Sequence, residues 1–223
     1  MTDIRDMNAL AVRDSMDVVA KVRVADLGRT TPCEGWDLAD LLGHMTVQHH
    51  GFAAAARGEG ADLAVWKFAP AGEDAVAQYL AASEEVLAAF AELDDTLDFV
   101  FDLPEFKIDP PRFPARFAIG FHFIDYVVHA WDVAATLGVP YVLRPELEDT
   151  AVRVALSVPN EDNRLAAGAA FVPALEEAKN AKNTEDAEDA EDAEDAGPKD
   201  GAALERVLRY LGRRPDWRAG LGD

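Results

Sequence analysis

The stretch ARFAIGFHFIDYVVHAWDVAATLG, residues 115–138, decides the fold of this chain. It runs without a proline and ends on Gly138, so it predicts one helix of about 35 Å. A helix of that length can run along a whole bundle. Within it, Asp125 and His129 lie four residues apart on one face, and His122 lies three residues before Asp125. Because the surrounding residues are apolar, a carboxylate here needs a compensating partner.

Helical patterns lie on both sides of this stretch. Apolar spacing, alanine-rich composition and capping residues predict further helices, with Asp37 as an N-cap, over 6–25, 38–58, 72–95 and 145–157. Prolines at 104, 110, 111 and 114 exclude a continuous helix across 97–114, which we expect to be irregular. Four long helices with short connections predict an all-α four-helix bundle with short C-terminal helical additions.

The chain is expected to divide into four segments. They are the bundle over 1–140, a helical extension over 141–178, an acidic insert over 179–200 and a closing helix over 201–223 that docks on the bundle. The insert contains the repeat EDAEDAEDAEDA at 185–196. A repeat this rich in charge favours a solvated segment that is disordered or marginally helical. The alternative is an acidic tail that docks a basic partner.

Composition narrows the classes of function. The net charge is −21, and it is still −13 without the eight acids of the repeat. A surface of that sign repels phosphate groups, so we expect neither a nucleic-acid partner nor an anionic membrane surface. No stretch reaches 18 uninterrupted apolar residues, the N-terminus has no secretory pattern, and Cys33 is the single cysteine. These features predict a cytoplasmic protein, which we expect to be a monomer or a homodimer. They leave a small neutral or thiol-bearing substrate open, because the local field of a pocket need not follow the net charge.

The histidines carry most of the chemical information. All five lie in two of the predicted helices, at positions 44, 49, 50, 122 and 129. A carboxylate and an imidazole one turn apart, as in Asp125 and His129, can chelate one divalent ion. His44 on a facing helix would complete three protein ligands and leave a position open, as in catalytic zinc sites. The alternative is a simple ion pair or hydrogen bond between Asp125 and His129 in a helical core.

Neighbouring residues have open roles. Three roles are open for His122: a fourth metal ligand, an acid–base group, or a residue on the helix surface. We expect His49 and His50 to lie at the surface or at a pocket rim. Asp132 can either orient an imidazole or pair with a base such as Arg13, and the pairing is favoured. Cys33 is interpreted as a small buried hydrophobic residue in a loop, with a nucleophile or a ligand as the alternative.

Three motifs, in order along the chain, resemble a known family. The stretch TTPCEGWDLADLLGHM at 30–45 resembles the pattern T-P-C-x-G-W followed by D-L-x-x-H, and HFIDYVVHAWDVAATLG at 122–138 resembles a second signature. The stretch LERVLRYLGRRPDW at 204–217 is similar to the L-G-R-x-P-x-W ending of a short, single-domain branch. The family is the DinB-like, mycothiol-dependent maleylpyruvate isomerase superfamily of actinobacteria, and the short branch is described mostly as metal-binding.

The resemblance implies a fold and a site. The fold would be the DinB-type four-helix bundle, and the metal would be zinc held by His44, Asp125 and His129. The family has His or Glu where this chain has Asp125. Compared with Glu, Asp125 keeps the carboxylate oxygen donor, but its side chain is one methylene shorter. The isomerase carries a sizeable C-terminal domain, whereas about 85 residues follow Gly138 here, so the substrate-binding residues of that domain are not carried over. We also match no arginine to a substrate carboxylate clamp. Maleylpyruvate itself is therefore not the expected substrate.

Three functions follow from these observations. The first is an enzyme in which a divalent metal activates a low-molecular-weight thiol of the mycothiol type, for isomerisation or S-transfer on a small molecule. In it, His122 or His49 would shuttle the proton, because imidazole titrates near neutral pH. The second is a non-catalytic metal-binding or metal-sensing module. The third is an interaction protein that recruits a basic partner through its acidic insert.

Overall fold

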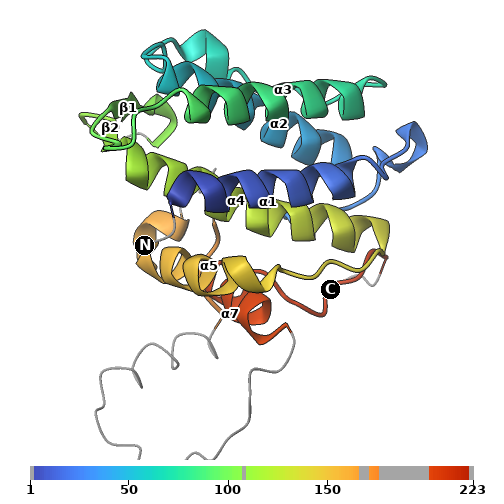
Figure 1. Ribbon diagram of the computed structural model, residues 1–223. Coiled ribbons are helices and arrows are strands. Elements are labelled where there is room, and N and C mark those ends of the chain that lie inside the picture. Colours follow the sequence, from blue (N-terminus) through green and yellow to red (C-terminus); the bar gives the residue numbers. More distant parts are fainter. Residues whose placement is uncertain (1–2, 107–108, 166–170, 176–200, 221–223) are drawn as a thin grey trace, which may run out of the picture. The chain divides into compact units, whose positions relative to one another are not determined.

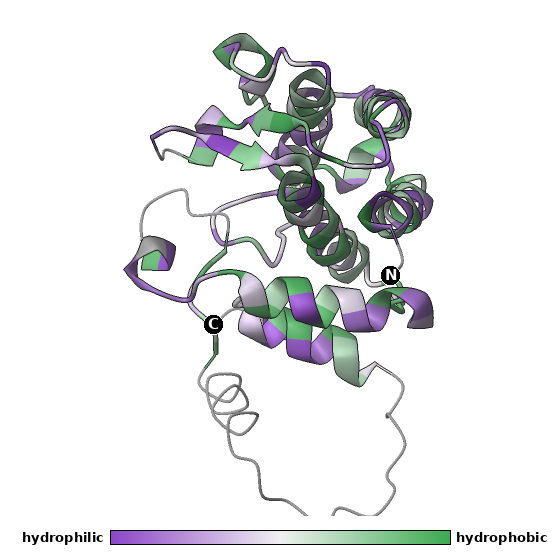
Figure 2. Ribbon diagram, turned by 60° about the vertical axis from the view of Figure 1, so that its left-hand side comes forward, coloured by the Kyte–Doolittle hydropathy of each residue, from purple (hydrophilic) through white to green (hydrophobic). Residues whose placement is uncertain are grey.

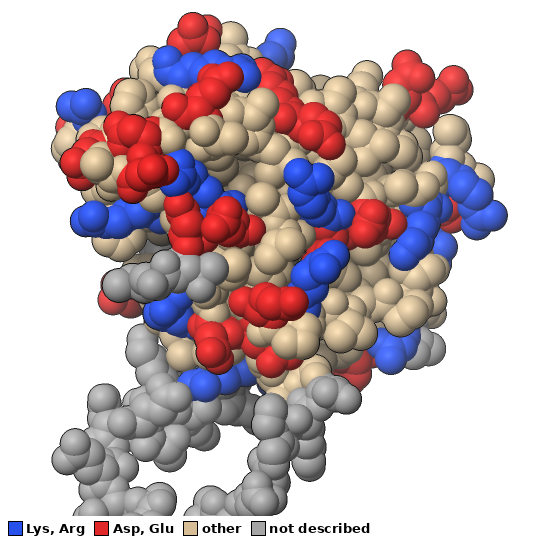
Figure 3. Space-filling model, viewed as in Figure 1, with Lys and Arg blue, Asp and Glu red and all other residues tan. Residues whose placement is uncertain are grey.

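The computed structural model describes residues 3–106, 109–165, 171–175 and 201–220. These residues form two compact units, one of Met1–Tyr141 with Arg218–Asp223 and one of Val142–Trp217. The whole of the expected insert over 179–200, including the acidic repeat, lies outside the described residues. Within the described residues no helix is both long and apolar enough to cross a membrane. On the face drawn in Figure 3, acidic and basic side chains are interspersed.

Four helices build the first unit, as the sequence predicts (Figure 1). They are α1 (Ile4–Val19), α2 (Leu38–Ala56), α3 (Ala75–Ala91) and α4 (Ala115–Leu137). Helix α1 packs against α3 and α4, and α2 packs against the same two helices. The four therefore close a ring around two clusters of buried apolar residues. Helix α4 is buried along nearly its whole length, which explains why its sequence is apolar on every side.

The helix ends follow the expected local chemistry. Asp37 caps α2, because its carboxylate accepts a hydrogen bond from the Asp40 backbone N–H. The Asp40 carboxylate in turn accepts a hydrogen bond from the Asp37 backbone N–H. Gly138 ends α4 with a left-handed φ of 70°. Helix α1 ends before the predicted boundary, because a separate short turn, η1 (Val24–Asp26), follows it. The prediction of one continuous helix over 6–25 is thus wrong at its C-terminal end.

The segment predicted to be irregular contains a small β-hairpin. Strands β1 (Val100–Asp102) and β2 (Arg112–Pro114) pair antiparallel, with Phe101 opposite Phe113. The short helix η3 (Pro104–Phe106) lies in the connection between them. The prolines do exclude a continuous helix here, but their positions at strand ends and in the connection still allow a three-residue ladder. Pro114 ends β2 and immediately precedes α4.

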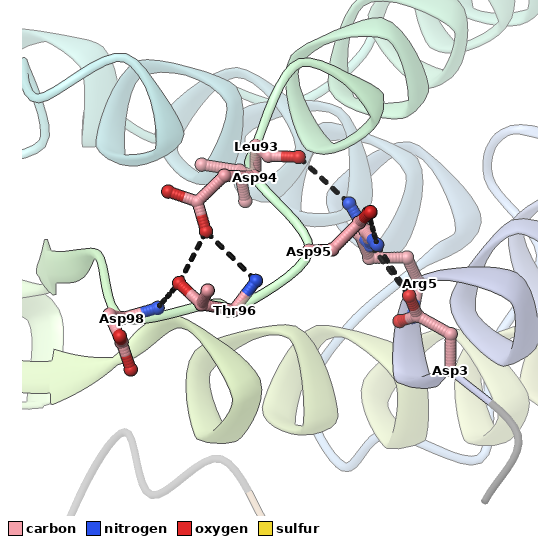
Figure 4. A network of polar contacts seen from close by, with 7 residues as sticks. All are labelled: Asp3, Arg5, Leu93, Asp94, Asp95, Thr96 and Asp98. Carbon is pink, nitrogen blue, oxygen red and sulfur yellow. Dashed lines mark hydrogen bonds and ion pairs between the residues drawn. The ribbon is translucent and has the colours of Figure 1, made fainter.

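A charged cluster joins the start of α1 to the loop after α3 (Figure 4). The Arg5 guanidinium donates to the Leu93 carbonyl at 2.8 Å and to Asp95 at 2.9 Å, and it also binds Asp3. In the same loop, Asp94 accepts from the Thr96 backbone N–H at 2.9 Å, which closes a tight turn after the helix. These contacts end α3 at Ala91, a few residues before its predicted end.

The second unit contains α5 (Pro145–Ser157), η4 (Asp162–Leu165) and α7 (Ala202–Tyr210). Helices α5 and α7 pack against each other, and both mix hydrophobic and hydrophilic residues (Figure 2). Arg164 is buried, and its guanidinium donates to the carbonyls of Pro159 at 2.7 Å and Tyr210 at 2.6 Å. This arginine satisfies carbonyl groups at the ends of both helices. The docking of the last helix on the bundle stays a prediction.

The linker between α2 and α3 approaches α2 closely at Gly43, which provides a test of this packing. A Cβ atom at Gly43 would lie 2.2 Å from the Ala69 carbonyl oxygen, which is backbone. We expect Gly43→Ala to reduce the free energy of unfolding by about 1–3 kcal/mol, because the linker must shift. Urea denaturation followed by circular dichroism measures this change.

Gly120 is the matched control, because it also lies in a bundle helix and a Cβ atom there meets nothing within 4 Å. We expect Gly120→Ala to leave stability unchanged or to raise it by up to about 1 kcal/mol through helix propensity. Equal stability of Gly43→Ala and the unmodified protein would contradict the close approach of the linker.

Candidate metal centre

The bundle brings together the three residues that the sequence selects as metal ligands. His44 lies on α2, and Asp125 and His129 lie one turn apart on α4. The Asp125 carboxylate is 3.7 Å from His44 Nε2 and 3.3 Å from His129 Nε2. One ligand atom from each residue lies within 4.8 Å of the others. Because α2 and α4 pack directly against each other, the expected facing of these two helices is confirmed.

The cluster is open to solvent on one side. The side chains of His44 and Asp125 are 23% and 17% exposed, whereas that of His129 is 3% exposed. His129 therefore closes the inner side of the cluster, and the other two line the accessible side. The Trp36 ring, 5.1 Å from the His44 ring, borders this opening and also packs against a cluster of buried apolar residues.

Electrostatics make Asp125 and His129 a strong ion pair. Burial opposes ionisation of Asp125, but the charge and hydrogen bond of His129 and the bond from His44 outweigh it and hold the pKa of Asp125 below its ordinary value. Burial also opposes protonation of His129, but the Asp125 carboxylate raises the pKa of His129 well above its ordinary value. A cation bound here would take the place of the proton on His129 Nε2.

A buried carboxylate, that of Asp132, orients the His129 ring through Nδ1, the nitrogen that does not face Asp125. Asp132 is fully buried, and its Oδ2 accepts from His129 Nδ1 at 2.8 Å. The Cys33 thiol donates to the same oxygen at 3.3 Å. Fixing Nδ1 as a donor leaves His129 Nε2 facing Asp125 and His44. The structure thus shows the orienting geometry of Asp132, which the sequence analysis ranked below a pairing with Arg13.

A hydrogen bond from a side chain to a backbone carbonyl spans the two helices beside the candidate ligands. The Tyr126 hydroxyl, next to Asp125, donates to the carbonyl of Met45, next to His44. Tyr126 is fully buried. This hydrogen bond joins α2 and α4 at the residues adjacent to the ligands, so it holds the spacing across which an ion would be bound.

His49 and His122 occupy the core of the bundle, away from the surface. His49 is 0% exposed, so its expected position at the surface or at a pocket rim is wrong; His122 is 1% exposed. The two rings meet through His49 Nδ1 and His122 Nε2 at 3.1 Å. Both α3 and α4 pack on α2, so a wider face of α2 is buried than we expected from the sequence. His49 lies on that buried face. His50, in contrast, is exposed as expected and contacts Glu85.

These histidines belong to a hydrogen-bonded chain with one residue from each bundle helix. His122 Nδ1 meets Asn8 Oδ1 on α1 at 2.7 Å, and His49 Nε2 meets the Ser83 hydroxyl on α3 at 3.0 Å. Burial lowers the pKa of His49 well below its ordinary value and that of His122 to about 3, so both rings are neutral near pH 7. The chain fixes the register of the four helices. A part in proton transfer stays a prediction for these two residues.

Glu105 is a candidate that the sequence analysis missed. It lies on η3, is half-buried, and accepts from the Gln48 side-chain amide at 2.6 Å. Gln48 is one turn after His44 on α2. Burial raises the pKa of Glu105 to about 7, against the hydrogen bond from Gln48, and the charge of Asp125 adds to the rise. No sequence motif marks a glutamate in an irregular, proline-rich segment, whereas the shared stripe of His44 and Gln48 is readable from their spacing.

Comparisons with known proteins agree with this architecture. Residues 9–134 match the family model described as the mycothiol maleylpyruvate isomerase N-terminal domain. An uncharacterized protein of Mycobacterium tuberculosis, found in two strains, is 30% identical over 135 residues. That match covers 58% of this chain and 65% of the relative, so the chain spans less than two thirds of its length.

Two crystal structures resemble the fold. One is the mycothiol-dependent maleylpyruvate isomerase, with a TM-score of 0.53 and 14% identity, and the other is a mutant of it, with a TM-score of 0.55 and 13% identity. Each match covers 74% of this chain and 75% of the other chain. At this identity the likeness concerns the fold alone. All three candidate ligands lie within the segment that matches the family model.

The two neutral core histidines predict how stability depends on pH. Their pKa values in the folded state lie below the unfolded value of about 6.5. The unfolded state therefore binds more protons below pH 6.5, and the free energy of unfolding falls as the pH falls towards 3. Each histidine contributes a slope of about 1.4 kcal/mol per pH unit. Urea denaturation at a series of pH values measures this slope.

His122→Gln removes one of the titrating groups, so we expect a smaller slope for this variant between pH 4 and 6. His50→Gln is the matched control, because His50 lies on the exposed side of the same bundle. An unchanged slope in His122→Gln would contradict the assignment of a neutral His122 in the folded core.

Proposed function

Because this chain belongs to the mycothiol maleylpyruvate isomerase N-terminal domain family, we propose that it binds a divalent cation, zinc by preference, through His44, Asp125 and His129. The resemblance to this superfamily is thereby confirmed, and so is the DinB-like all-α fold, whereas the motif at 204–217 lies outside the matched residues. The observation that supports the metal most directly is the convergence of three donor atoms within 4.8 Å, from two helices, on a partly exposed face.

The donor set fits a zinc ion. Two imidazole nitrogens and one carboxylate oxygen are the ligand types of catalytic zinc sites. Ligand atoms about 2.1 Å from the ion at a tetrahedral angle lie roughly 3.4 Å apart. His129 Nε2 lies 3.3 Å from Asp125 Oδ1 and His44 Nε2 lies 3.7 Å from Asp125 Oδ2, so each imidazole is near that spacing from one of the two carboxylate oxygens. Asp132 holds His129 Nδ1, as a carboxylate behind a zinc-bound histidine does.

The proposed ligand of this site is a low-molecular-weight thiol of the mycothiol type. The ion, when bound, supplies a positive charge that lowers the pKa of a coordinated thiol. The protein orients the site: His129 closes the inner side, and the exposed edges of His44 and Asp125 leave room for a fourth group. The thiolate would then serve in isomerisation or S-transfer on a small molecule. The likeness in family supports this reaction class, but it does not identify the substrate.

A non-catalytic metal-binding or metal-sensing module is the second candidate. It requires the same three ligands, but it predicts a coordination shell closed to added thiol. The exposed fractions of His44 and Asp125 favour the open site and thus the first candidate.

Metal content tests the ligand set. We expect the full chain, purified without a metal-affinity tag and supplied with zinc, to hold about one zinc ion per chain by elemental mass spectrometry. The variants His44→Ala, Asp125→Ala and His129→Ala each remove one ligand and are expected to lose most of it. His50→Ala, a histidine on the exposed side of the bundle, keeps it. Zinc at background in the unmodified chain after reconstitution would refute the proposed metal site.

The orienting residue provides a second test. Asp132→Asn keeps the shape of the side chain but removes the charge that fixes His129. We expect the affinity for zinc to fall about 10–100-fold, measured by competition with a chelating dye. Asp98→Asn, at an exposed position in the first unit, is the matched control. Unchanged affinity in a folded Asp132→Asn would mean that Asp132 only satisfies polar groups in the core.

A further inference from the structure

Glu105 is a half-buried carboxylate close to the candidate metal centre but outside its three ligands. Its fixed contact is the Gln48 amide at 2.6 Å, which holds Oε2. Gln48 follows His44 by one turn of α2, so it lies on the same stripe as that ligand. The charge of Asp125 reaches Glu105 from α4. Residues of both helices that supply the ligands thus act on this one carboxylate.

The position of η3 is held by aromatic packing. The Phe106 ring, next to Glu105, lies 5.2 Å from the Phe121 ring and 5.0 Å from the Phe113 ring. Phe121 is one turn before Asp125 on α4, so this contact seats η3 beside the metal-binding stretch of that helix. Phe113 belongs to β2, which extends the same support into the hairpin. Glu105 is therefore positioned by a packed element and not by a free loop.

The surroundings of Glu105 do not match those of a structural ion pair. The described groups that act on its pKa are Gln48 and Asp125, and neither is a cation. Burial, the largest cause, raises the pKa of Glu105 to about 7. A bound cation would offset the charge of Asp125, but it would leave the effect of burial. A carboxyl group with a pKa near working pH, in a partly exposed site, suits proton transfer.

We propose that Glu105 is the acid–base residue of this site and takes the proton of a thiol that binds beside His44 and Asp125. This inference rests on the proposed function. The S–H bond breaks, the electron pair stays on sulfur, and the proton forms an O–H bond with Oε1 of Glu105. The amide of Gln48 keeps Oε2 occupied and so directs Oε1 to the thiol. When the thiol leaves, the same carboxyl group returns the proton.

The two core histidines are poorer candidates for this step. His49 and His122 are almost completely buried, and their ring nitrogens already meet each other, Asn8 and Ser83. Protonation of either ring near pH 7 would place a charge in the core, which burial opposes. Glu105 instead combines partial exposure with an oxygen that no described hydrogen bond occupies.

Proton counting on the full chain loaded with Co²⁺ tests the proposal, with N-acetylcysteine as the thiol probe. Isothermal titration calorimetry at pH 8 in buffers of different ionisation enthalpy gives the number of protons released when the thiol binds. We expect clearly fewer than one for the unmodified protein, because the negative charge of the bound thiolate raises the pKa of Glu105 further and the carboxyl group then retains most of the proton. We expect about one for Glu105→Gln, which cannot keep it, while Co²⁺ remains bound.

The rate of thiol binding is the second readout. In stopped-flow measurements of the cobalt–thiolate absorption, we expect Glu105→Gln to bind the thiol on the order of 10²-fold more slowly. Glu105→Ala also removes the acid and must give the same proton count, which excludes an effect of the new amide. Glu84→Gln, an exposed glutamate on α3, is the matched control and should behave like the unmodified protein.

The outcomes separate this inference from the proposed function. If Glu105→Gln binds Co²⁺ and the thiol with an unchanged rate and proton count, the acid–base role is wrong and the metal-dependent function stands. If Glu105→Gln loses Co²⁺, Glu105 is a metal ligand and the acid–base role is again wrong. If the unmodified chain binds no Co²⁺ or no thiol, the proposed function fails and this inference fails with it.

Discussion

The compensation of one partly buried carboxylate, Asp125, is the interaction on which the rest of the site depends. Helix α4 is apolar on nearly every side, so an ionised group within it is costly unless charge of the opposite sign is close. His129 supplies that charge from the same helix, and His44 adds a contact from α2. The carboxylate therefore requires α2 to face α4, and the facing helices in turn create a cluster that a cation can occupy.

A second polar system holds the helices that present this cluster. Asn8, His49, Ser83 and His122 connect all four bundle helices through hydrogen bonds. A one-residue rotation of any helix would leave buried donors and acceptors unpaired, which costs more than shifting apolar side chains. These hydrogen bonds therefore specify a single register of the four helices. That register in turn determines where His44 meets Asp125. His49 and His122, which the sequence analysis named as catalytic candidates, thus help to fix the register of the helices.

The sequence predicts well what depends on local periodicity. The four bundle helices, the Asp37 cap, the Gly138 end and the pairing of Asp125 with His129 follow from spacing and capping chemistry. It fails where burial depends on several neighbours at once. His49 is buried because two helices cover α2, and Glu105 gains its environment from a hairpin whose strands have only three residues each. Neither arrangement leaves a periodic signal, so neither is readable from one sequence.

The hydrogen bond from Tyr126 to the Met45 carbonyl has a consequence for ion choice. It couples the two helix backbones at positions adjacent to Asp125 and His44, and aspartate reaches less far than glutamate. In the proposed metal site, the distance from the backbone to a bound ion would therefore be set by the packing of two helices rather than by adjustment of long side chains. Such a site would select between cations by their radius.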